Sequence, residues 1–207
     1  HPGGLYLARK HQVPFVLEVN SPLALESKKY RQLANENLAT GLSRLLLREA
    51  DVIVCVSNEI KDWVVSERGH EEGVILVPNG VDQEIFKPNA GNRPSSLPPN
   101  DVPLIGFTGT FRPWHGIHDL LLSFETLVKE MGSDAHLLCI GDGPEKQAFE
   151  INVQKKGLRD RVHFTGSIPH SSVGEWLGYC DLGVAPYPKM DEFWFSPLKI
   201  FEYFSSG

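Results

Sequence analysis

Short apolar runs alternate with amphipathic helical patterns along this chain, and this alternation constrains its fold more than any other feature. The runs are short, as buried strands are. They lie at residues 13–19, 52–56, 74–77, 104–107, 136–140, 162–164 and 182–185. Strands separated by helices are typical of parallel sheets with crossover connections, so the sequence predicts an α/β fold.

The series of strands and helices is interrupted once, at residues 87–101. This stretch is rich in Pro, Asn, Gly and Ser and poor in large apolar residues, a composition typical of linkers. We therefore predict two parallel-sheet domains, one within residues 1–86 and the other within residues 102–207.

The charge balance argues against a nucleic-acid partner. The chain of 207 residues has a net charge of -6, whereas affinity for nucleic acids comes mainly from Lys and Arg side chains that neutralise phosphates. Basic residues between Lys28 and Arg48 share one predicted helix. A solvated helix face explains them, and peripheral contact with a membrane surface is the alternative.

Cysteine usage and the length of the apolar runs predict a cytoplasmic protein. Cys55, Cys139 and Cys180 are odd in number and lie in or beside apolar runs, which is typical of buried thiols in a reducing compartment. The sequence has no apolar run of about 18 residues and no charged-then-apolar leader, so neither a membrane-spanning helix nor a signal peptide is expected. Peripheral association with the inner face of the membrane stays open.

One long helix is predicted over residues 27–49. Leu38, Leu42 and Leu45 recur there with the spacing of a single helix face, and a helix with such a stripe packs the stripe against a core. We therefore expect these three leucines to be buried.

Capping residues predict where three further helices begin or end. Ser57 and Gly69 have the chemistry of an N-cap and a C-cap. Ser172 and Glu175 have the spacing of a capping box. Ser196, followed by proline, suits the start of a helix that runs to residue 206.

Four loops follow the strands of the second half, at residues 108–116, 141–144, 166–169 and 186–197. Ligands of open parallel sheets bind at the carboxyl ends of the strands, which share one edge. Several of these loops carry glycines and precede helices, so their backbone amides can hold an anion. The loops together predict an anion site.

Two charged residues fit such a site. The guanidinium of Arg112 can grip a diphosphate, and the carboxylate of Glu202 can accept hydrogen bonds from sugar hydroxyls. Each also has a plain structural interpretation: Arg112 as an exposed loop cation, and Glu202 as the partner of Lys199 in a surface pair three residues apart.

Other kinds of site fit the sequence less well. Gly141 and Gly143 begin a dinucleotide fingerprint, but position 146 is lysine rather than glycine. His115 and His118 have no third metal ligand nearby, so no metal site is expected. No Gly-x-Ser-x-Gly elbow provides a nucleophile.

The loop and helix sequences in order resemble a known family. The segments are VPNGVD, GFTGTFRPWHGIHDLL, CIGDGPEKQ, VHFTGSIPHSSV, YCDLGVAPY and SPLKIFEYFSSG. In this order and spacing they are similar to the family 4 retaining glycosyltransferases of the GT-B architecture. The resemblance implies two Rossmann-like domains, both incomplete in this chain: 1–86 as the C-terminal part of the acceptor-side domain and 102–207 as the N-terminal part of the donor-binding domain.

The resemblance also implies an activity. A hexosyl group would move from a nucleotide diphosphate sugar to a hydroxyl of a carbohydrate or lipid-linked acceptor, with retention at the anomeric carbon. Such transfer serves glycan, polysaccharide or glycolipid synthesis and needs neither a metal nor a cofactor in this family. The chain by itself is expected to be inactive if both of its domains are incomplete.

The family's motifs assign roles to residues of this chain. By resemblance, Arg112, Glu202 and His115 are catalytic, with Arg112 at the donor diphosphate and Glu202 at the ribose. The remaining expected contacts with the donor are Gly109, Thr110, Gly141, Gly166, Ser167, Ile168, Ser196, Pro197 and Leu198. Glu18 and Asn20 are expected on the acceptor side.

This chain departs from the family's pattern at several of these positions. Trp194 stands where a second glutamate is expected, and Asp191 or Glu192 is the alternative contact for the donor sugar. His115 stands where a lysine is expected, so that its charge would be partial near neutral pH and leaving-group stabilisation weaker or pH-dependent. Asn20 replaces a histidine near the acceptor.

Two other functions remain open. One is a sugar-nucleotide epimerase of the same architecture, which shares the donor cleft. The other is a glycosyltransferase-like subunit that holds a nucleotide sugar without turnover, which Trp194 and His115 keep in consideration.

Overall fold

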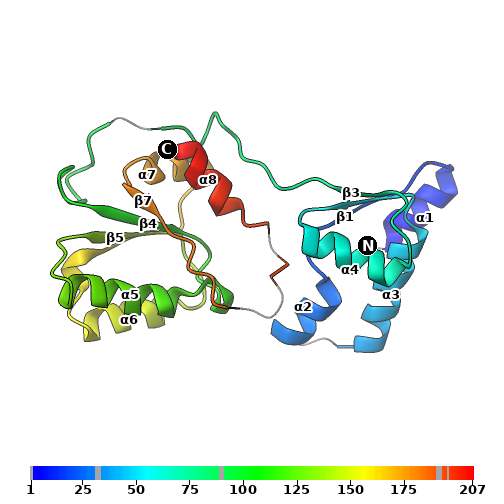
Figure 1. Ribbon diagram of the computed structural model, residues 1–207, viewed down its shortest axis with the longest axis horizontal. Coiled ribbons are helices and arrows are strands. Elements are labelled where there is room, and N and C mark those ends of the chain that lie inside the picture. The colour runs from blue at the N-terminus through cyan, green and yellow to red at the C-terminus, as the bar shows by residue number, and fades with distance from the viewer. Residues whose placement is uncertain (1, 31–33, 89–90, 190–192, 195) are drawn as a thin grey trace. The chain divides into compact units, whose positions relative to one another are not determined.

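The computed structural model describes residues 2–30, 34–88, 91–189, 193–194 and 196–207 (Figure 1). The chain divides into two compact units. The first comprises His1–Asn79 and Met190–Pro197, and the second comprises Gly80–Lys189 and Leu198–Gly207. Each unit has its own sheet and its own core.

The first unit is a three-stranded parallel sheet with strand order β1-β2-β3. Its strands are β1 (Val16–Val19), β2 (Val52–Cys55) and β3 (Val74–Leu76). Its helices are α1 (Pro2–His11), α2 (Leu23–Tyr30), α3 (Glu36–Glu49) and α4 (Asn58–Arg68). Ile53 and Cys55 of β2 are fully buried, together with Ile60 and Val64 of α4, so α4 covers the face to which these strand residues point.

Helix α4 has the predicted ends. The Ser57 hydroxyl accepts a hydrogen bond from the N–H of Ile60 at 3.2 Å. Gly69 ends the helix with a φ of 86°, in the left-handed region that glycine adopts without strain.

The prediction of one long helix over residues 27–49 is wrong. The segment forms α2 and α3, and the Asn35 side chain caps α3 by accepting from the N–H of Leu38 at 3.0 Å. The predicted apolar face is also wrong, because Leu38 and Leu45 are 59% and 44% exposed whereas Leu47 is 2% exposed. Three leucines in succession at residues 45–47 fit more than one helix face, so periodicity alone could not select the buried one.

The second unit is a four-stranded parallel sheet with strand order β6-β5-β4-β7. Its strands are β4 (Leu104–Thr108), β5 (His136–Ile140), β6 (Val162–Gly166) and β7 (Leu182–Gly183). Its helices are α5 (Ile117–Lys129), α6 (Lys146–Lys155), α7 (His170–Leu177) and α8 (Leu198–Ser206), with single 3-10 turns η1 (Pro113–His115) and η2 (Arg159–Arg161).

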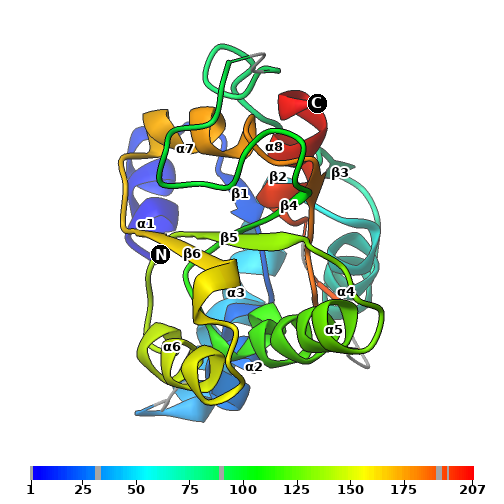
Figure 2. The same ribbon diagram turned by 90° about the vertical axis from the view of Figure 1, so that its left-hand side faces the viewer.

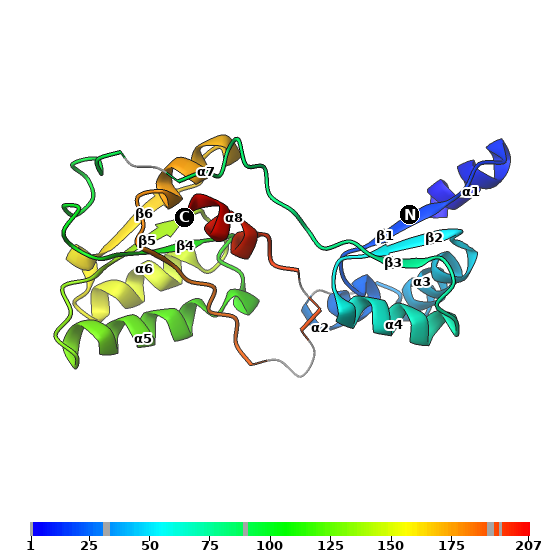
Figure 3. The ribbon, with the colours of Figure 1, turned by 45° about the horizontal axis from the view of Figure 1, so that its top comes forward.

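Helices cover both faces of this sheet. Helices α5 and α6 lie on one side, and α7 and α8 lie on the other (Figures 2 and 3). On β5, Leu137 and Cys139 point to the core shared with α5 and α6, and Leu138 and Ile140 point to the opposite core. Burial on both sides explains why this strand is apolar from Leu137 to Ile140 rather than alternating.

The strands predicted from the sequence are all present, with ends that differ by a few residues. The largest differences are at β1, which begins at Val16, and at β7, which is only two residues long. Cys55 and Cys139 are buried as expected, and Cys180 is partly exposed. Within the described part of the chain, no helix is long and apolar enough to cross a bilayer.

Two of the predicted caps in the second half do not form. Helix α7 begins at His170, directly after Pro169, so Ser172 lies inside the helix and no side chain caps its start. The Ser196 hydroxyl accepts a hydrogen bond from the N–H of Asn79 at 3.3 Å, within the first unit.

Candidate functional site

Glycines bring the loops after β4 and β5 into backbone contact. A Cβ at Gly141, whose φ is 126°, would stand 2.2 Å from the carbonyl oxygen of Gly109. A Cβ at Gly143 would stand 1.7 Å from the carbonyl oxygen of Thr110. The N–H of Gly109 also donates to the carbonyl of Ile140 at 3.0 Å. The two predicted loops therefore form one rigid edge that only glycine permits.

Phe111 holds the loop that carries Arg112. Its side chain is fully buried against Phe107 and Phe149, whereas its backbone has a φ of 43°. A bulky residue in the left-handed region is strained, and such strain is found at functional sites where surrounding packing imposes it. The buried ring and the strained backbone turn the following residue, Arg112, toward solvent.

Arg112 is available to a ligand. Its side chain is exposed, its guanidinium carbon lies 5.9 Å from the centroid of the Trp114 ring, and no ion pair to it is present among the residues that the structure describes.

Helix α8 is fastened to the same edge by Tyr203. The Tyr203 hydroxyl accepts a hydrogen bond from the N–H of Thr108 and donates one to the carbonyl of Val184, both at 3.0 Å. The ring lies so close to Gly183 that a Cβ there would stand 2.6 Å from it. Tyr203 thereby positions the first turns of α8, including Lys199 and Glu202, at the ends of β4 and β7.

Lys199 is buried on the inward face of α8. It is 7% exposed, and its Nζ lies 4.6 Å from the centroid of the Phe107 ring and 5.2 Å from that of Tyr187. No hydrogen-bond partner of Nζ exists in the described part of the chain. Burial lowers the pKa of Lys199 to about 8. The interpretation of Lys199 as half of a surface pair is therefore wrong.

Glu202 is also more enclosed than that interpretation allows. Its side chain is 14% exposed, and its Oε1 lies 3.8 Å from Nε2 of His170 on α7. Burial raises the pKa of Glu202, while the neighbouring His170 and Lys199 act in the opposite direction. A half-buried carboxylate next to solvent is suited to accept hydrogen bonds from ligand hydroxyls.

His115 does not carry the partial charge expected from its sequence position. Burial lowers its pKa to about 4, and the positive charges of Lys199 and Arg112 act in the same direction. The imidazole is therefore neutral at neutral pH, and a pH dependence of the site near neutrality is not expected from it. Its Nδ1 has no hydrogen-bond partner among the described residues.

The loop after β6 borders the loop after β5. Gly166, with a φ of 69°, pairs with Gly141 in an isolated bridge, and the N–H of Gly141 donates to the hydroxyl of Thr165 at 3.3 Å. Ser167 is exposed, whereas Ile168 packs against a buried cluster. Three of the four predicted loops thus meet at one edge of the second sheet.

Other predicted residues belong to the first unit. Glu18 and Asn20 lie exposed at the end of β1, where the Asn20 amide donates to Oε1 of Glu18 at 2.9 Å. Trp194 packs edge-on against Trp63 at 6.3 Å, and its carbonyl accepts from the Ser57 hydroxyl at 3.2 Å.

Three further predicted residues, at positions 196 to 198, lie where the chain passes from the first unit to the second. Ser196 and Pro197 belong to it, and Leu198 begins α8 with an exposed side chain. Asp191 and Glu192, the proposed alternatives to the missing glutamate, lie outside the described residues. Among the described residues, no three His, Cys, Asp or Glu side chains group as metal ligands do.

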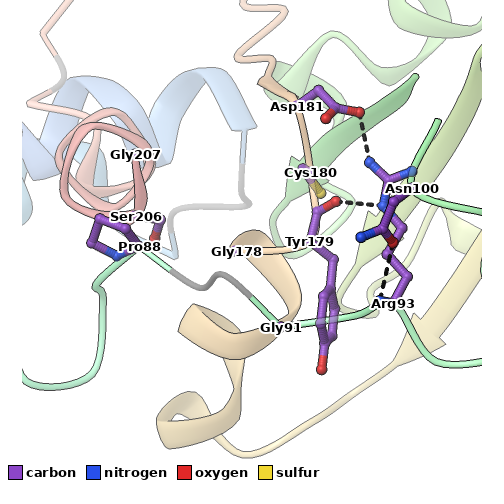
Figure 4. Close-up of a pocket in the computed structure, with 10 residues that line it drawn as sticks. All are labelled: Pro88, Gly91, Arg93, Asn100, Gly178, Tyr179, Cys180, Asp181, Ser206 and Gly207. Atoms are coloured by element: carbon purple, nitrogen blue, oxygen red, sulfur yellow. Dashed lines mark hydrogen bonds and ion pairs between the residues drawn. The ribbon is translucent and has the colours of Figure 1, made fainter. Parts of the chain in front are cut away.

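A cavity of about 460 Å³ lies elsewhere on the second unit, around Arg93 (Figure 4). The Arg93 side chain forms an ion pair with Asp181 at 2.6 Å and donates to the carbonyls of Tyr179 and Val102 at 2.9 and 2.6 Å. Its donors are occupied by the protein. Arg93 therefore fastens the segment before β4 to the end of α7, and none of the predicted site residues lines this cavity.

The two parallel sheets with their crossover helices define the α/β class of proteins, and the sequence comparisons identify the family within it. The family described as "Glycosyl transferases group 1" matches residues 89–193, about half of the chain, and "Glycosyltransferase Family 4" matches residues 1–85. The chain belongs to these group 1, family 4 glycosyltransferases.

Two curated relatives illustrate the similarity. The chain is 28% identical over 155 residues to a 2-deoxystreptamine glucosyltransferase of Streptomyces kanamyceticus, covering 72% of this chain and 40% of the relative. It is 30% identical over 141 residues to the GPI3 subunit of the phosphatidylinositol N-acetylglucosaminyltransferase of Saccharomyces cerevisiae, covering 66% and 30%. The chain spans less than half of the length of these curated relatives.

Solved structures establish the architecture. HepE of Anabaena in complex with UDP has a TM-score of 0.73 at 17% identity, covering 98% of this chain and 54% of that one. A sucrose-phosphate synthase of Thermosynechococcus elongatus has a TM-score of 0.69 at 20% identity, covering 88% and 48%. The expectation of a GT-B fold with parallel α/β sheets is confirmed.

Lys199 is the residue of this edge that sequence reasoning missed. The buried positions of α8 are Lys199 and Ser206, and Tyr203 lies between them with helical spacing. That spacing places Lys199 on the inward face and was readable from the sequence. The three-residue spacing to Glu202 suggested a surface pair instead.

Proposed function

We propose that the protein containing this chain is a retaining, metal-independent glycosyltransferase that moves a hexosyl group from a nucleotide diphosphate sugar to an acceptor hydroxyl in glycan, polysaccharide or glycolipid synthesis. The observation that carries the proposal is the convergence of Arg112, the interlocked loops at Gly109 and Gly141, and the half-buried carboxylate of Glu202 at one edge of the second sheet.

Each part of this edge has a role toward the donor. Exposed Arg112 and exposed Thr110 face the diphosphate, and Gly109, whose N–H is bonded to the carbonyl of Ile140, lies in the same loop. Glu202 accepts hydrogen bonds from the ribose hydroxyls, and the loop at Gly166, Ser167 and Ile168 borders the base. Leu198, at the start of α8, presents its backbone to the phosphates together with Ser196 and Pro197.

The chemistry requires stabilisation of the leaving group. The bond between the anomeric carbon and the diphosphate oxygen breaks, and its electron pair goes to the diphosphate. A bond forms between the anomeric carbon and the acceptor oxygen on the same face, and the acceptor proton passes to the departing phosphate. Positive groups placed in advance around the diphosphate lower this barrier, and loss of one typically costs about a hundredfold in rate.

The relatives support a nucleotide-sugar donor. One similar structure is a complex with UDP and another is a complex of the same protein with UDP-glucose. The names of the curated relatives are those of glucosyl- and N-acetylglucosaminyltransferases. We propose no cofactor, and we place Glu18 and Asn20 on the acceptor side. We expect a cytoplasmic protein, and one that associates with the inner face of the membrane if its acceptor is lipid-linked.

Binding measurements on the full-length protein test the site. UDP-, GDP- and ADP-sugars are first screened by thermal shift, because stabilisation grows with the ratio of ligand concentration to Kd. Arg112→Ala and Glu202→Ala are then each expected to weaken the affinity for the selected donor, measured by calorimetry, at least about tenfold. Arg48→Ala, which removes an exposed arginine of α3, is the control. Unchanged affinity in both site variants would refute the site.

Product analysis tests the reaction. A transferred sugar together with free nucleotide diphosphate supports the proposal, and NMR of the product's anomeric proton reports retention or inversion. An epimerised nucleotide sugar would instead indicate the epimerase. Binding without any product would indicate a subunit that only holds the nucleotide sugar.

A further inference from the structure

An ammonium group without a partner is buried at the proposed donor edge. Lys199 is 7% exposed, and its Nζ has no acceptor among the residues that the structure describes. Burying a charged group without hydrogen bonds is strongly unfavourable, so proteins rarely retain one that has no function. The Nζ of Lys199 lies 4.6 Å and 5.2 Å from the ring centroids of Phe107 and Tyr187, whose faces attract a cation but accept no conventional hydrogen bond from it.

A second polar group without a partner lies beside Lys199. Nδ1 of His115 and Nζ of Lys199 both lie within 3.2 Å of one point, the position that a Cβ on Gly109 would occupy. Neither atom has a hydrogen-bond partner in the described part of the chain. Two polar atoms therefore converge on the backbone of the loop that carries Arg112.

The charges around this point are unbalanced. Lys199 and Arg112 are the cations, and His115 is kept neutral by burial and by both of them. Glu202 is the anion that acts on Lys199, but no ion pair joins them within 4 Å. A diphosphate carries at least two negative charges and would supply the acceptors that this group of side chains lacks.

We propose that Lys199 of α8 is a second cation of the donor site and contacts the diphosphate together with Arg112. This inference rests on the proposed function. The lysine reaches the site from α8, which Tyr203 fastens to β4 and β7, rather than from the loop itself. When the anomeric C–O bond breaks, Lys199 donates to the oxygen that receives the electron pair.

The test compares Lys199→Met and Lys199→Gln with wild type in the full-length protein. The probes are UDP, GDP and ADP, each with its nucleoside, and the readout is calorimetric affinity. Loss of the ammonium should weaken the affinity for the nucleoside diphosphate at least about tenfold and leave the affinity for the nucleoside unchanged. Lys155→Met, which changes an exposed lysine at the end of α6, should alter neither affinity.

Thermal stability without ligand gives a second readout that a structural role would not produce. Removal of an unpaired buried charge should raise the melting temperature of Lys199→Met, because methionine fills similar space without the cost of burying a charge. A lysine that merely holds the fold would show the opposite shift.

The outcomes separate the inference from the function on which it rests. If wild type binds none of the diphosphates, the proposed function fails and the inference fails with it. Two outcomes overturn the inference alone, provided that wild type binds a diphosphate. In one, both Lys199 variants bind the diphosphate as tightly as wild type does. In the other, their affinity for the nucleoside falls by the same factor as their affinity for the diphosphate. Selective loss of the diphosphate in the Gln variant supports it even if the Met variant does not fold.

Discussion

His136 and His163 stack at the start of β5 and β6, with ring centroids 5.1 Å apart and Nδ1 of one 2.8 Å from Nε2 of the other. One ring nitrogen must donate and the other accept, so the pair is stable when both rings are neutral. Burial lowers the pKa of both histidines, and nearby arginines add to the effect. The charged groups acting on the pair are Arg93, Asp134, Arg159 and Arg161.

We therefore expect the second unit to lose stability in mild acid. A histidine whose pKa is lowered in the folded state stabilises the protein above its ordinary value of 6.5, and this contribution is lost as the pH falls below that value. Urea unfolding at about pH 7.5 and about pH 5.5 measures it.

The matched variants for this prediction are His163→Gln and His11→Gln. The first removes one of the two titrating rings and should show a smaller loss of stability between the two pH values. The second changes an exposed histidine at the end of α1 and should behave as wild type. If wild type and His163→Gln lost the same stability on acidification, other groups would be the cause.

At the scale of elements, the Tyr203 side chain fastens α8 to the second sheet. The Tyr203 hydroxyl bridges Thr108 on β4 and Val184 after β7, and its burial raises the pKa of the phenol. Tyr203→Phe leaves the N–H of Thr108 and the carbonyl of Val184 without this partner and should cost about 1–3 kcal/mol in the free energy of unfolding.

The same substitution should weaken the affinity for the nucleotide diphosphate, because α8 carries Lys199 and Glu202. Chemical denaturation and calorimetry on one preparation measure both effects. Tyr6→Phe, in which the tyrosine is 65% exposed, is the control. Unchanged stability of Tyr203→Phe would mean that α8 is positioned by packing alone.

The elements differ in how far the sequence could predict them. The strands were predictable because short apolar runs between helical patterns fit few structures besides a buried strand. Ser57 and Gly69 lie at helix ends with no competing pattern. The face of α3 was not predictable, because Leu45, Leu46 and Leu47 offer several faces to choose from.

The site was predictable in part. Loop order along the chain placed Arg112 and Glu202 near one edge, because the carboxyl ends of parallel strands meet there. The states of His115 and Lys199 were not predictable, since burial sets their pKa values and burial depends on the packing of α8 against β4. Charge at this site is a property of tertiary structure.

At the scale of the whole molecule, the proposed donor groups are concentrated in one unit. Arg112, Lys199 and Glu202 all belong to the second unit, whereas Glu18 and Asn20 belong to the first. Each unit has a separate buried core, so each can respond to a ligand on its own.

Hydrogen exchange of the full-length protein should show this division. A nucleotide diphosphate is expected to slow exchange most in residues 108–116, 141–144 and 166–169 and in α8, because these backbones border the ligand. Peptides from α3, in the first unit, serve as the internal reference. Protection confined to the first unit would contradict the proposed nucleotide site in the second unit.

Phe111 has a consequence for mutagenesis of the loop that carries Arg112. Glycine or asparagine at this position would accept the φ of 43° but would remove a fully buried ring. A β-branched residue would fill part of the space but resist the backbone. Mutant libraries that vary residues 112–114 while keeping Phe111 should therefore retain more folded clones than libraries that include it.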